Sequence, residues 1–574
     1  MPPVSPSSHP HSPPTNPPQL PPRSSSFTAG ITAWLDKVPA HWPHRLIHIP
    51  TLTSTPRTGT STYGTTTCPS YGILTYTWGR WKDRSPHPTP AVPISGTDWP
   101  IPSVTPDHFT VEAFLKVIAR IGQEVEWVWI DVACIDQRDD SAQKAEEIGK
   151  QVGIFRGAKC CFVWLSRLST AELSEGWGRV LGESCRLQFH GEGDAKLGDP
   201  DEALGEILPA LLRALEGLFR DPWFSSLWTL QEAILRNDAL VLSHEADTIA
   251  LEEEGGEAYL AILVSYCSNI RKDLLRIAER RRRAFMFGRK HGIDQLISQV
   301  LEKVHEVGLI YLVVDNPNIQ YGAARYRQTK RPLDRIYGIT QIYGIAMGEA
   351  KELWELQDRF AGEICRRCPV LGQLFVHIKK PAPGDSWRIT EFSSVPEDLR
   401  DYPSAVPKCT IEFRKHHDVL FTGKSILLVD FLQQWAQWLQ KASADKKNYF
   451  DRHPEFLYSC LNLHIDDAAE EERTMSYNPY SPGAAKRDEV GKLRLPSVLK
   501  QVRGYGDLTE TLSESWCAGT KVSDVAVLWL GTRNNKKAVS LREKSNEVGL
   551  LARIRGNFCR EVVEQVEGYE YHIQ

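Results

Sequence analysis

Several polar side chains directly follow the apolar run Val125–Ile130 and could form a catalytic site. They are Asp131, Cys134, Asp136 and Gln137. Ligands of open parallel sheets bind at the carboxyl ends of the strands, so Asp131 is placed to act as a general acid or base. The structural alternative is that Asp131 and Asp136 cap turns and the next helix, while Gln137 binds loop backbone groups. Cys134 has no histidine beside it in the sequence to form a thiolate, and we expect it to pack as a small apolar residue.

A polar pair, Gln231 and Glu232, interrupts an expected apolar helix face. A helix beginning at Pro222 would carry this face. The face consists of Phe224, Leu227, Trp228, Gln231 and Leu235. A buried amide or carboxylate without partners costs about 1–3 kcal/mol, so we expect the pair to hydrogen-bond the ends of neighbouring strands. A direct catalytic role for Glu232 is the alternative. We predict that Trp223, Trp228 and Gln231 are buried.

Aromatic residues close to the expected strand ends offer platforms for a ligand. Trp78 and Trp129 could stack on a nucleotide base, and the alternative is that both pack in the core. Gly79 directly follows the apolar segment Ile73–Trp78 and ends it. Trp78 and Gly79 are therefore the candidate ligand-binding residues.

The order of the expected elements predicts an α/β fold. Strands are predicted at residues 45–49, 73–78, 125–130 and 160–165, with helices between the last three. The second of these helices would be capped by Ser141. Its apolar stripe consists of Ala145, Ile148, Val152 and Phe155. Such alternation indicates a parallel sheet with helices on its faces, in which the last three strands are neighbours. The rest is predicted to be a loop at residues 51–69 and insertions at residues 80–106 and 166–206.

The composition divides the chain into four regions. Residues 1–27 contain ten prolines and few large apolar residues, so we expect a disordered tail. Residues 28–245 carry the α/β fold, and residues 246–345 are helical in character. Residues 346–574 are expected to form a mixed α/β C-terminal region of unknown fold. This region includes strand-like segments at Val525–Gly531 and Val548–Arg553.

Three segments occur in the order and spacing of one known family. They are Tyr71–Gly79, Trp129–Gln137 and Pro222–Glu232, here called the first, second and third blocks. They resemble the fungal heterokaryon-incompatibility (HET) domain, whose blocks read Y-x-A-L-S-Y-x-W-G, W-I-D-x-x-C-I-D-Q and R-x-W-F-x-R-x-W-x-x-Q-E. The resemblance covers about residues 45–240. This chain has Thr75 where the family usually has serine, and Ser226 where it usually has arginine.

HET domains are similar to TIR domains, and this resemblance implies a TIR-like parallel sheet flanked by helices. In TIR domains the helix after the second strand block can bear a glutamate that cleaves NAD, which corresponds to a position near Glu147 here. The resemblance also implies a role in non-self recognition and programmed cell death. The function would be signalling by homotypic assembly or, alternatively, NAD cleavage, with NAD as the substrate and no cofactor. We predict that Glu147 lies in a pocket shared with Asp131 or Trp78.

Charge and composition argue against several classes of function. The 68 Lys and Arg against 72 Asp and Glu give a formal net charge of −4, which does not suit a nucleic-acid surface. No apolar run is long enough to span a membrane and no secretory signal is visible, so we expect a cytoplasmic protein. Cys365 and Cys368 have no second ligand pair, so we expect no metal site. The expected partners are a second copy of the chain or other HET-type proteins.

Overall fold

The computed structural model describes residues 40–138, 141–192, 200–251, 256–283, 291–312, 316–345 and 347–373, with shorter stretches between 375 and 555. The tail predicted for residues 1–27 lies outside the described residues. The chain divides into two compact units. The first unit is Met1–Gly182 with Arg213–Tyr266, and the second is Glu183–Leu212 with Cys267–Gln574.

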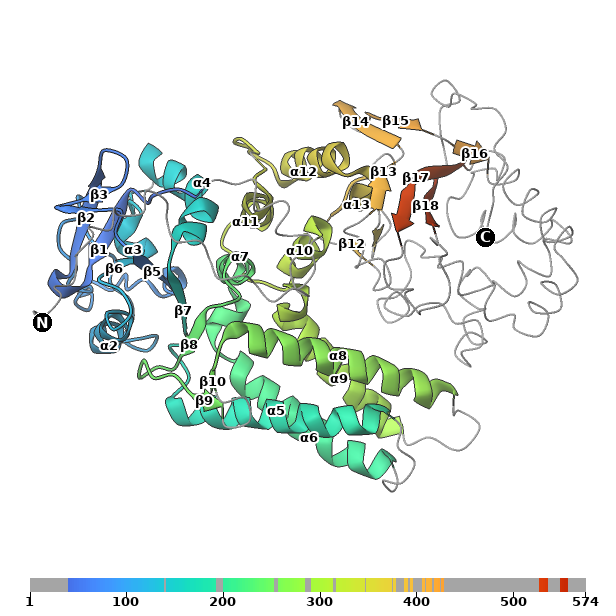
Figure 1. Ribbon diagram of the computed structural model, residues 1–574, viewed down its shortest axis with the longest axis horizontal. Helices are drawn as coiled ribbons and strands as arrows, with labels where there is room; N and C mark the ends of the chain where they lie inside the picture. Colours follow the sequence, from blue (N-terminus) through green and yellow to red (C-terminus); the bar gives the residue numbers. More distant parts are fainter. Residues whose placement is uncertain are drawn as a thin grey trace, which may run out of the picture. The chain divides into compact units, whose positions relative to one another are not determined.

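An eight-stranded sheet forms the centre of the first unit, in the strand order β4-β3-β2-β1-β6-β5-β7-β8 (Figure 1). The bounds are β1 Arg45–His48, β2 Thr53–Thr58, β3 Thr62–Tyr63, β4 Thr66–Thr67, β5 Tyr71–Thr75, β6 Trp127–Trp129, β7 Cys160–Trp164 and β8 Leu240–Leu242. All residues of β5 and β6 are buried, as expected for strands that are covered on both faces.

The central strands confirm the predicted parallel arrangement. β5 pairs in parallel with β6, where Ile73 is opposite Trp129, and with β7, where Thr75 is opposite Val163. β8 continues the parallel part beside β7. Parallel strands of this kind need crossover connections, and α2 (Val111–Ile121) and α4 (Ala142–Gly157) lie in the two crossovers.

The sheet as a whole is mixed rather than parallel, which corrects the expectation. β1 runs antiparallel to both β6 and β2. Residues 51–69, predicted as a loop, supply the antiparallel strands β2, β3 and β4. The stretch is rich in threonine, whose branched side chain suits strands, and Gly59 and Gly64 take the positive φ values of 59° and 58° that its tight turns need.

The third block corrects a second expectation. A 3-10 turn, η3 (Pro222–Ser225), is followed by α7 (Leu227–Leu235), where a single helix from Pro222 was predicted. Asp221 caps η3, but Ser226 is extended, with φ −80° and ψ 138°. The break changes the rotation of the second helix about its axis. Trp223 and Gln231 are buried as predicted. Because of the break, Trp228 is only half-buried.

Residues 166–206, predicted as an insertion, contain α5 (Thr170–Glu192) and the beginning of α6 (Pro200–Phe219). In this stretch Leu173, Trp177 and Val180 follow helical spacing and are buried. Gly176 allows a close approach of the two helices, because a Cβ there would lie 2.9 Å from the Leu218 side chain.

The second unit contains both helices and strands. Its helices include α9 (His291–Val307), α10 (Pro317–Ala324), α11 (Asp334–Thr340), α12 (Leu353–Arg367) and α13 (Pro369–Gln373). Two of its strands, β17 (Ala526–Asn534) and β18 (Val548–Arg555), pair antiparallel. They confirm the strand-like segments predicted at Val525–Gly531 and Val548–Arg553.

Candidate functional site

The first and second blocks meet at the carboxyl ends of β5 and β6. The indole Nε1 of Trp78 donates a hydrogen bond of 2.7 Å to Oδ2 of Asp131. Oδ1 of Asp131 accepts from the backbone N–H of Val132 at 2.7 Å, and the Tyr76 hydroxyl also bonds this carboxylate. Asp131 is the first residue of the short helix α3 (Asp131–Cys134). It therefore holds the predicted edge position, but the N-cap of α3 is Ile130, and Asp131 itself accepts from the next backbone N–H.

The first and third blocks meet through a buried hydroxyl. Nε1 of Trp223 donates to Oγ1 of Thr75 at 2.8 Å, and Thr75 donates in turn to Oε2 of Glu232. Thr75 and Trp223 are both almost fully buried. Glu232 thus bonds the strand predicted at residues 73–78, as expected for a residue that joins the blocks.

The two carboxylates at this edge have unusual electrostatics. Burial, helped by the charge of nearby Asp131 and opposed by the hydrogen bond from Thr75, raises the pKa of Glu232 to about 8. Burial also raises the pKa of Asp131, while the bonds from Trp78, Val132 and Tyr76 and the charge of Lys82 oppose the rise. Near neutral pH Glu232 is mostly protonated, so the site pairs a carboxylic acid with the hydrogen-bonded carboxyl group of Asp131.

The predicted ligand-binding residues lie beside this pair. The Lys82 ammonium is 4.9 Å from the centre of the Trp78 ring, a cation–π distance. Gly79 begins the 3-10 turn η2 (Gly79–Trp81), and a Cβ added there would meet no atom within 4 Å. Open space therefore adjoins the backbone of Gly79, the residue after Trp78, which bonds Asp131.

Sequence reasoning missed three members of the site, Thr75, Tyr76 and Lys82. The signal for Thr75 was present, because it replaces the usual serine of the first block and so keeps a hydroxyl there. Tyr76 also belongs to the first block, but its pattern alone does not distinguish a core aromatic ring from a hydroxyl donor. Nothing in the sequence pattern pointed to Lys82, which follows the block.

Glu147 lies in a separate hydrogen-bond group. Its Oε1 accepts from the backbone N–H of His44 at 3.1 Å and from Nε1 of Trp129 at 3.3 Å. Its partners are therefore not Asp131 and Trp78, the residues expected to share its pocket. Glu147 is 1% exposed, and burial raises its pKa to about 7. The carboxylate joins α4 to β6 and to the segment just before β1.

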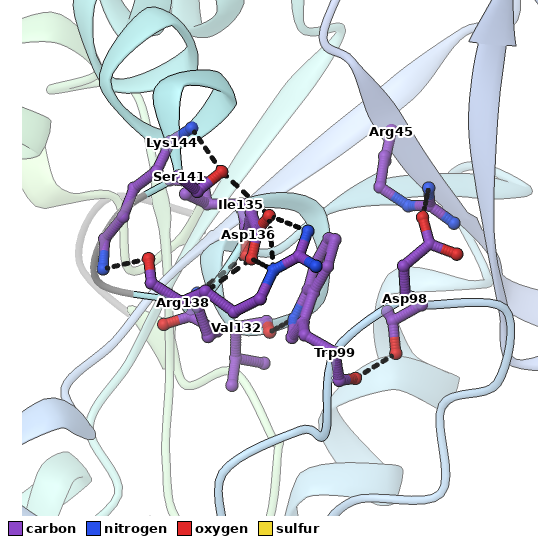
Figure 2. Close-up of polar contacts among 11 residues, drawn as sticks. Arg45, Asp98, Trp99, Val132, Ile135, Asp136, Arg138, Ser141 and Lys144 are labelled. Carbon is purple, nitrogen blue, oxygen red and sulfur yellow. Dashed lines mark hydrogen bonds and ion pairs between the residues drawn. The ribbon is translucent and has the colours of Figure 1, made fainter.

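The end of the second block is a capping network (Figure 2). Oδ2 of Asp136 accepts from Oγ of Ser141 at 2.8 Å, and Oδ1 accepts from the backbone N–H of Arg138 at 3.0 Å. Ser141 caps α4 by accepting from Lys144, as predicted. Gln137 donates to backbone oxygens, including that of Asp131 at 3.0 Å. These contacts confirm the structural alternative for Asp136 and Gln137.

The backbone oxygens of Val132 and Ala133, in the second block, accept hydrogen bonds from side chains outside the block. Arg45 donates to Oγ of Ser54 at 2.9 Å, and that hydroxyl donates to the backbone oxygen of Ala133 at 2.7 Å. Nε1 of Trp99 donates to the oxygen of Val132 at 3.4 Å, and Arg45 lies near Asp98 on the other side (Figure 2). Cys134 is buried and burial raises its pKa, so the thiol packs as expected.

Neither a metal-binding cluster nor a membrane-spanning helix occurs in the described part of the chain. No group of three or more His, Cys, Asp or Glu side chains there could hold a metal ion. None of the helices described is both long and apolar enough to cross a bilayer.

The fold and the site define a mixed α/β domain whose three blocks converge at one sheet edge. Residues 71–232 match the family described as Heterokaryon incompatibility protein (HET), so this part of the chain is a HET domain. The match begins with β5 and ends at Glu232, and it therefore encloses the whole site. Comparison with curated proteins and with solved structures gives no match.

Proposed function

We propose that this chain acts in heterokaryon incompatibility, as a cytoplasmic signalling module of non-self recognition that works by homotypic assembly. One observation carries the proposal beyond the family match. Polar side chains of the first block bond those of the second and third blocks, through the Trp78–Asp131 bond and the Trp223–Thr75–Glu232 relay. Such mutual bonding stabilises a scaffold, which suits a domain that presents a surface to a partner. The partner would be a second copy of the chain or another HET-type protein, and the output would be programmed cell death.

The test measures assembly and cell death together. The full chain is examined by light scattering at low and high concentration, and its expression is induced in fungal cells whose survival is counted. We expect larger assemblies at high concentration and loss of survival. The matched variants are Thr75→Val, which breaks the relay, and Thr75→Ser, which keeps the hydroxyl. Monomers at every concentration, together with full killing, would contradict homotypic assembly.

A second function, cleavage of NAD, is favoured by the acid pair beside Trp78. Two carboxyl groups at the carboxyl ends of parallel strands suit the hydrolysis of a glycosidic bond. In that reaction the bond between ribose and nicotinamide breaks, and nicotinamide leaves as a neutral molecule with the bonding electrons. Asp131 would stabilise the cationic ribose. Water then attacks the ribose and loses one proton, which gives ADP-ribose. The predicted likeness to TIR domains belongs to this proposal.

Three amide variants separate the roles of the carboxylates. Purified chain is incubated with NAD at low and high protein concentration, and released nicotinamide is measured. If the pair is catalytic, Asp131→Asn or Glu232→Gln abolishes release while Glu147→Gln retains it. The reverse pattern would assign the reaction to Glu147. No release by the unmodified chain at either concentration would contradict the enzymatic function.

A further inference from the structure

Cationic side chains follow the carboxyl ends of two adjacent strands, β5 and β7. Arg80 lies in η2, just after β5, and Arg167 lies shortly after β7. The strands pair in parallel, so their carboxyl ends lie at the same edge of the sheet. Arg80 is half-buried, whereas Arg167 is exposed. This edge is where open parallel sheets bind ligands.

A buried histidine, His108, lies near both arginines. The His108 ring stacks on Trp81, with ring centres 3.9 Å apart and planes at 6°. Its Nε2 donates to the backbone oxygen of Thr77 at 2.5 Å. The Arg80 guanidinium lies 4.9 Å from the centre of the same Trp81 ring. Burial lowers the pKa of His108 to about 4 against the bond to Thr77, and the charges of Arg167 and Arg80 add smaller contributions to the fall.

Polar atoms at this place are buried without hydrogen-bond partners among the described residues. They are Nδ1 of His108 and the hydroxyl of Ser166, the residue just before Arg167. Buried polar groups are nearly always bonded, so exceptions mark sites that require an explanation. Here the exceptions accompany two guanidinium groups, and open space adjoins the neighbouring Gly79 backbone. An anion with several oxygens would suit all of these features.

We propose that this edge of the sheet binds a phosphate or diphosphate group between Arg80 and Arg167. Guanidinium groups present paired donors that match phosphate oxygens. Such a group could belong to a nucleotide or be free in solution. The inference goes beyond the proposed function, because binding requires neither assembly nor the cleavage of NAD.

Titration calorimetry of the full chain at low salt tests the proposal with ADP, pyrophosphate and adenosine. We expect ADP and pyrophosphate to bind, with adenosine at least tenfold weaker, and we expect added salt to weaken both anions. Tighter binding of ADP than of pyrophosphate assigns the site to a nucleotide. Equal binding assigns it to a free anion. Equal binding of ADP and adenosine would overturn the proposal.

Variants locate the binding. Arg80→Gln and Arg167→Gln should each weaken ADP binding about tenfold or more, since each removes one charged partner. The matched control is Arg179→Gln, because Arg179 is an exposed arginine of α5 that pairs with Glu175 at 3.0 Å. Arg167 is exposed, so its variant should melt at the same temperature as the unmodified chain. The proposal is wrong if Arg167→Gln melts normally and binds ADP as tightly as the control. ADP lacks the nicotinamide–ribose bond, so this result is independent of any NAD cleavage.

Discussion

The indole N–H of Trp78 points at the Asp131 carboxylate across 2.7 Å, and this bond joins the first block to the second. Asp131→Asn keeps an acceptor for the indole and removes a charge that burial disfavours. We expect its free energy of unfolding to change by less than about 1 kcal/mol, whereas Asp131→Ala should lose about 1–3 kcal/mol. Urea denaturation at pH 7 measures both variants. Equal losses would show that the charge, and not the bond, is what matters.

The Thr75 hydroxyl is the only atom that both accepts from Trp223 and donates to Glu232 among the bonds described here. Thr75→Val preserves the shape and removes the hydroxyl, so a buried indole loses its acceptor. We expect a loss of about 1–3 kcal/mol in the free energy of unfolding. Thr75→Ser should keep the relay and recover most of that loss. A valine variant as stable as the serine variant would contradict the structural importance of the relay.

Glu147 predicts a dependence of stability on pH. Its pKa is about 7 in the folded chain against an ordinary value of 4.5, and burial is the main cause. Between these values the folded state binds more protons than the unfolded state, so stability should fall as pH rises from about 4.5 to about 7. In Glu147→Gln the side-chain amide oxygen can still accept from His44 and Trp129, but the amide does not titrate. Relative to the unmodified chain, we expect it to gain on the order of 2–3 kcal/mol between pH 4.5 and pH 8.

The control for this effect is the neighbouring residue. Glu146 is exposed and forms an ion pair with Lys150. Glu146→Gln should therefore leave the fall in stability between pH 4.5 and 8 almost unchanged. Denaturant titrations at several pH values measure the free energy of unfolding of the unmodified chain and of both variants. The explanation is wrong if Glu147→Gln shows the same fall as the unmodified chain.

Arg236 predicts a large loss of stability on substitution. It is 1% exposed, and it donates to the backbone oxygens of Ala158 at 3.0 Å and Phe155 at 3.2 Å. Arg236→Met fills similar space but leaves these acceptors of the α4 end without their donor, so we expect a loss of about 2–4 kcal/mol. Its ion-pair partner Asp238 is partly exposed, and Asp238→Asn should cost less than about 1 kcal/mol. Thermal and urea unfolding compare the two.

Alanine substitutions at two glycines should affect stability differently. Gly96 has φ +82°, and a Cβ there would lie 2.6 Å from the backbone oxygen of Ser54. Gly96→Ala should therefore destabilise the chain by more than about 1 kcal/mol. Gly79→Ala meets no atom within 4 Å and should change stability by less than about 0.5 kcal/mol. The melting temperatures of the two variants provide the measurement, and a neutral Gly96→Ala would contradict the strained turn.

Local pattern predicted the core of the fold well. The apolar runs at 73–78, 125–130 and 160–165 became adjacent parallel strands, because continuous apolar runs with helices between them can be buried in few other ways. Pattern failed at residues 51–69 and at Ser226. In the threonine-rich stretch β2 pairs with β1, while β3 and β4 find their partners within the stretch itself. At Ser226 one extended residue changes the face that the next helix buries.

The sequence by itself determined the family, the parallel pairing of the central strands and the carboxylates at their ends, since blocks and apolar periodicity are local properties. Only the tertiary structure decided how the carboxylates are grouped. It places Glu232 with Thr75 and near Asp131, and it places Glu147 with His44 and Trp129. Thr75 and Glu232 are 157 residues apart in the sequence, and His44 and Glu147 are 103 residues apart. Burial and hydrogen bonding set the pKa of each group, and both depend on which distant segments the fold brings into contact.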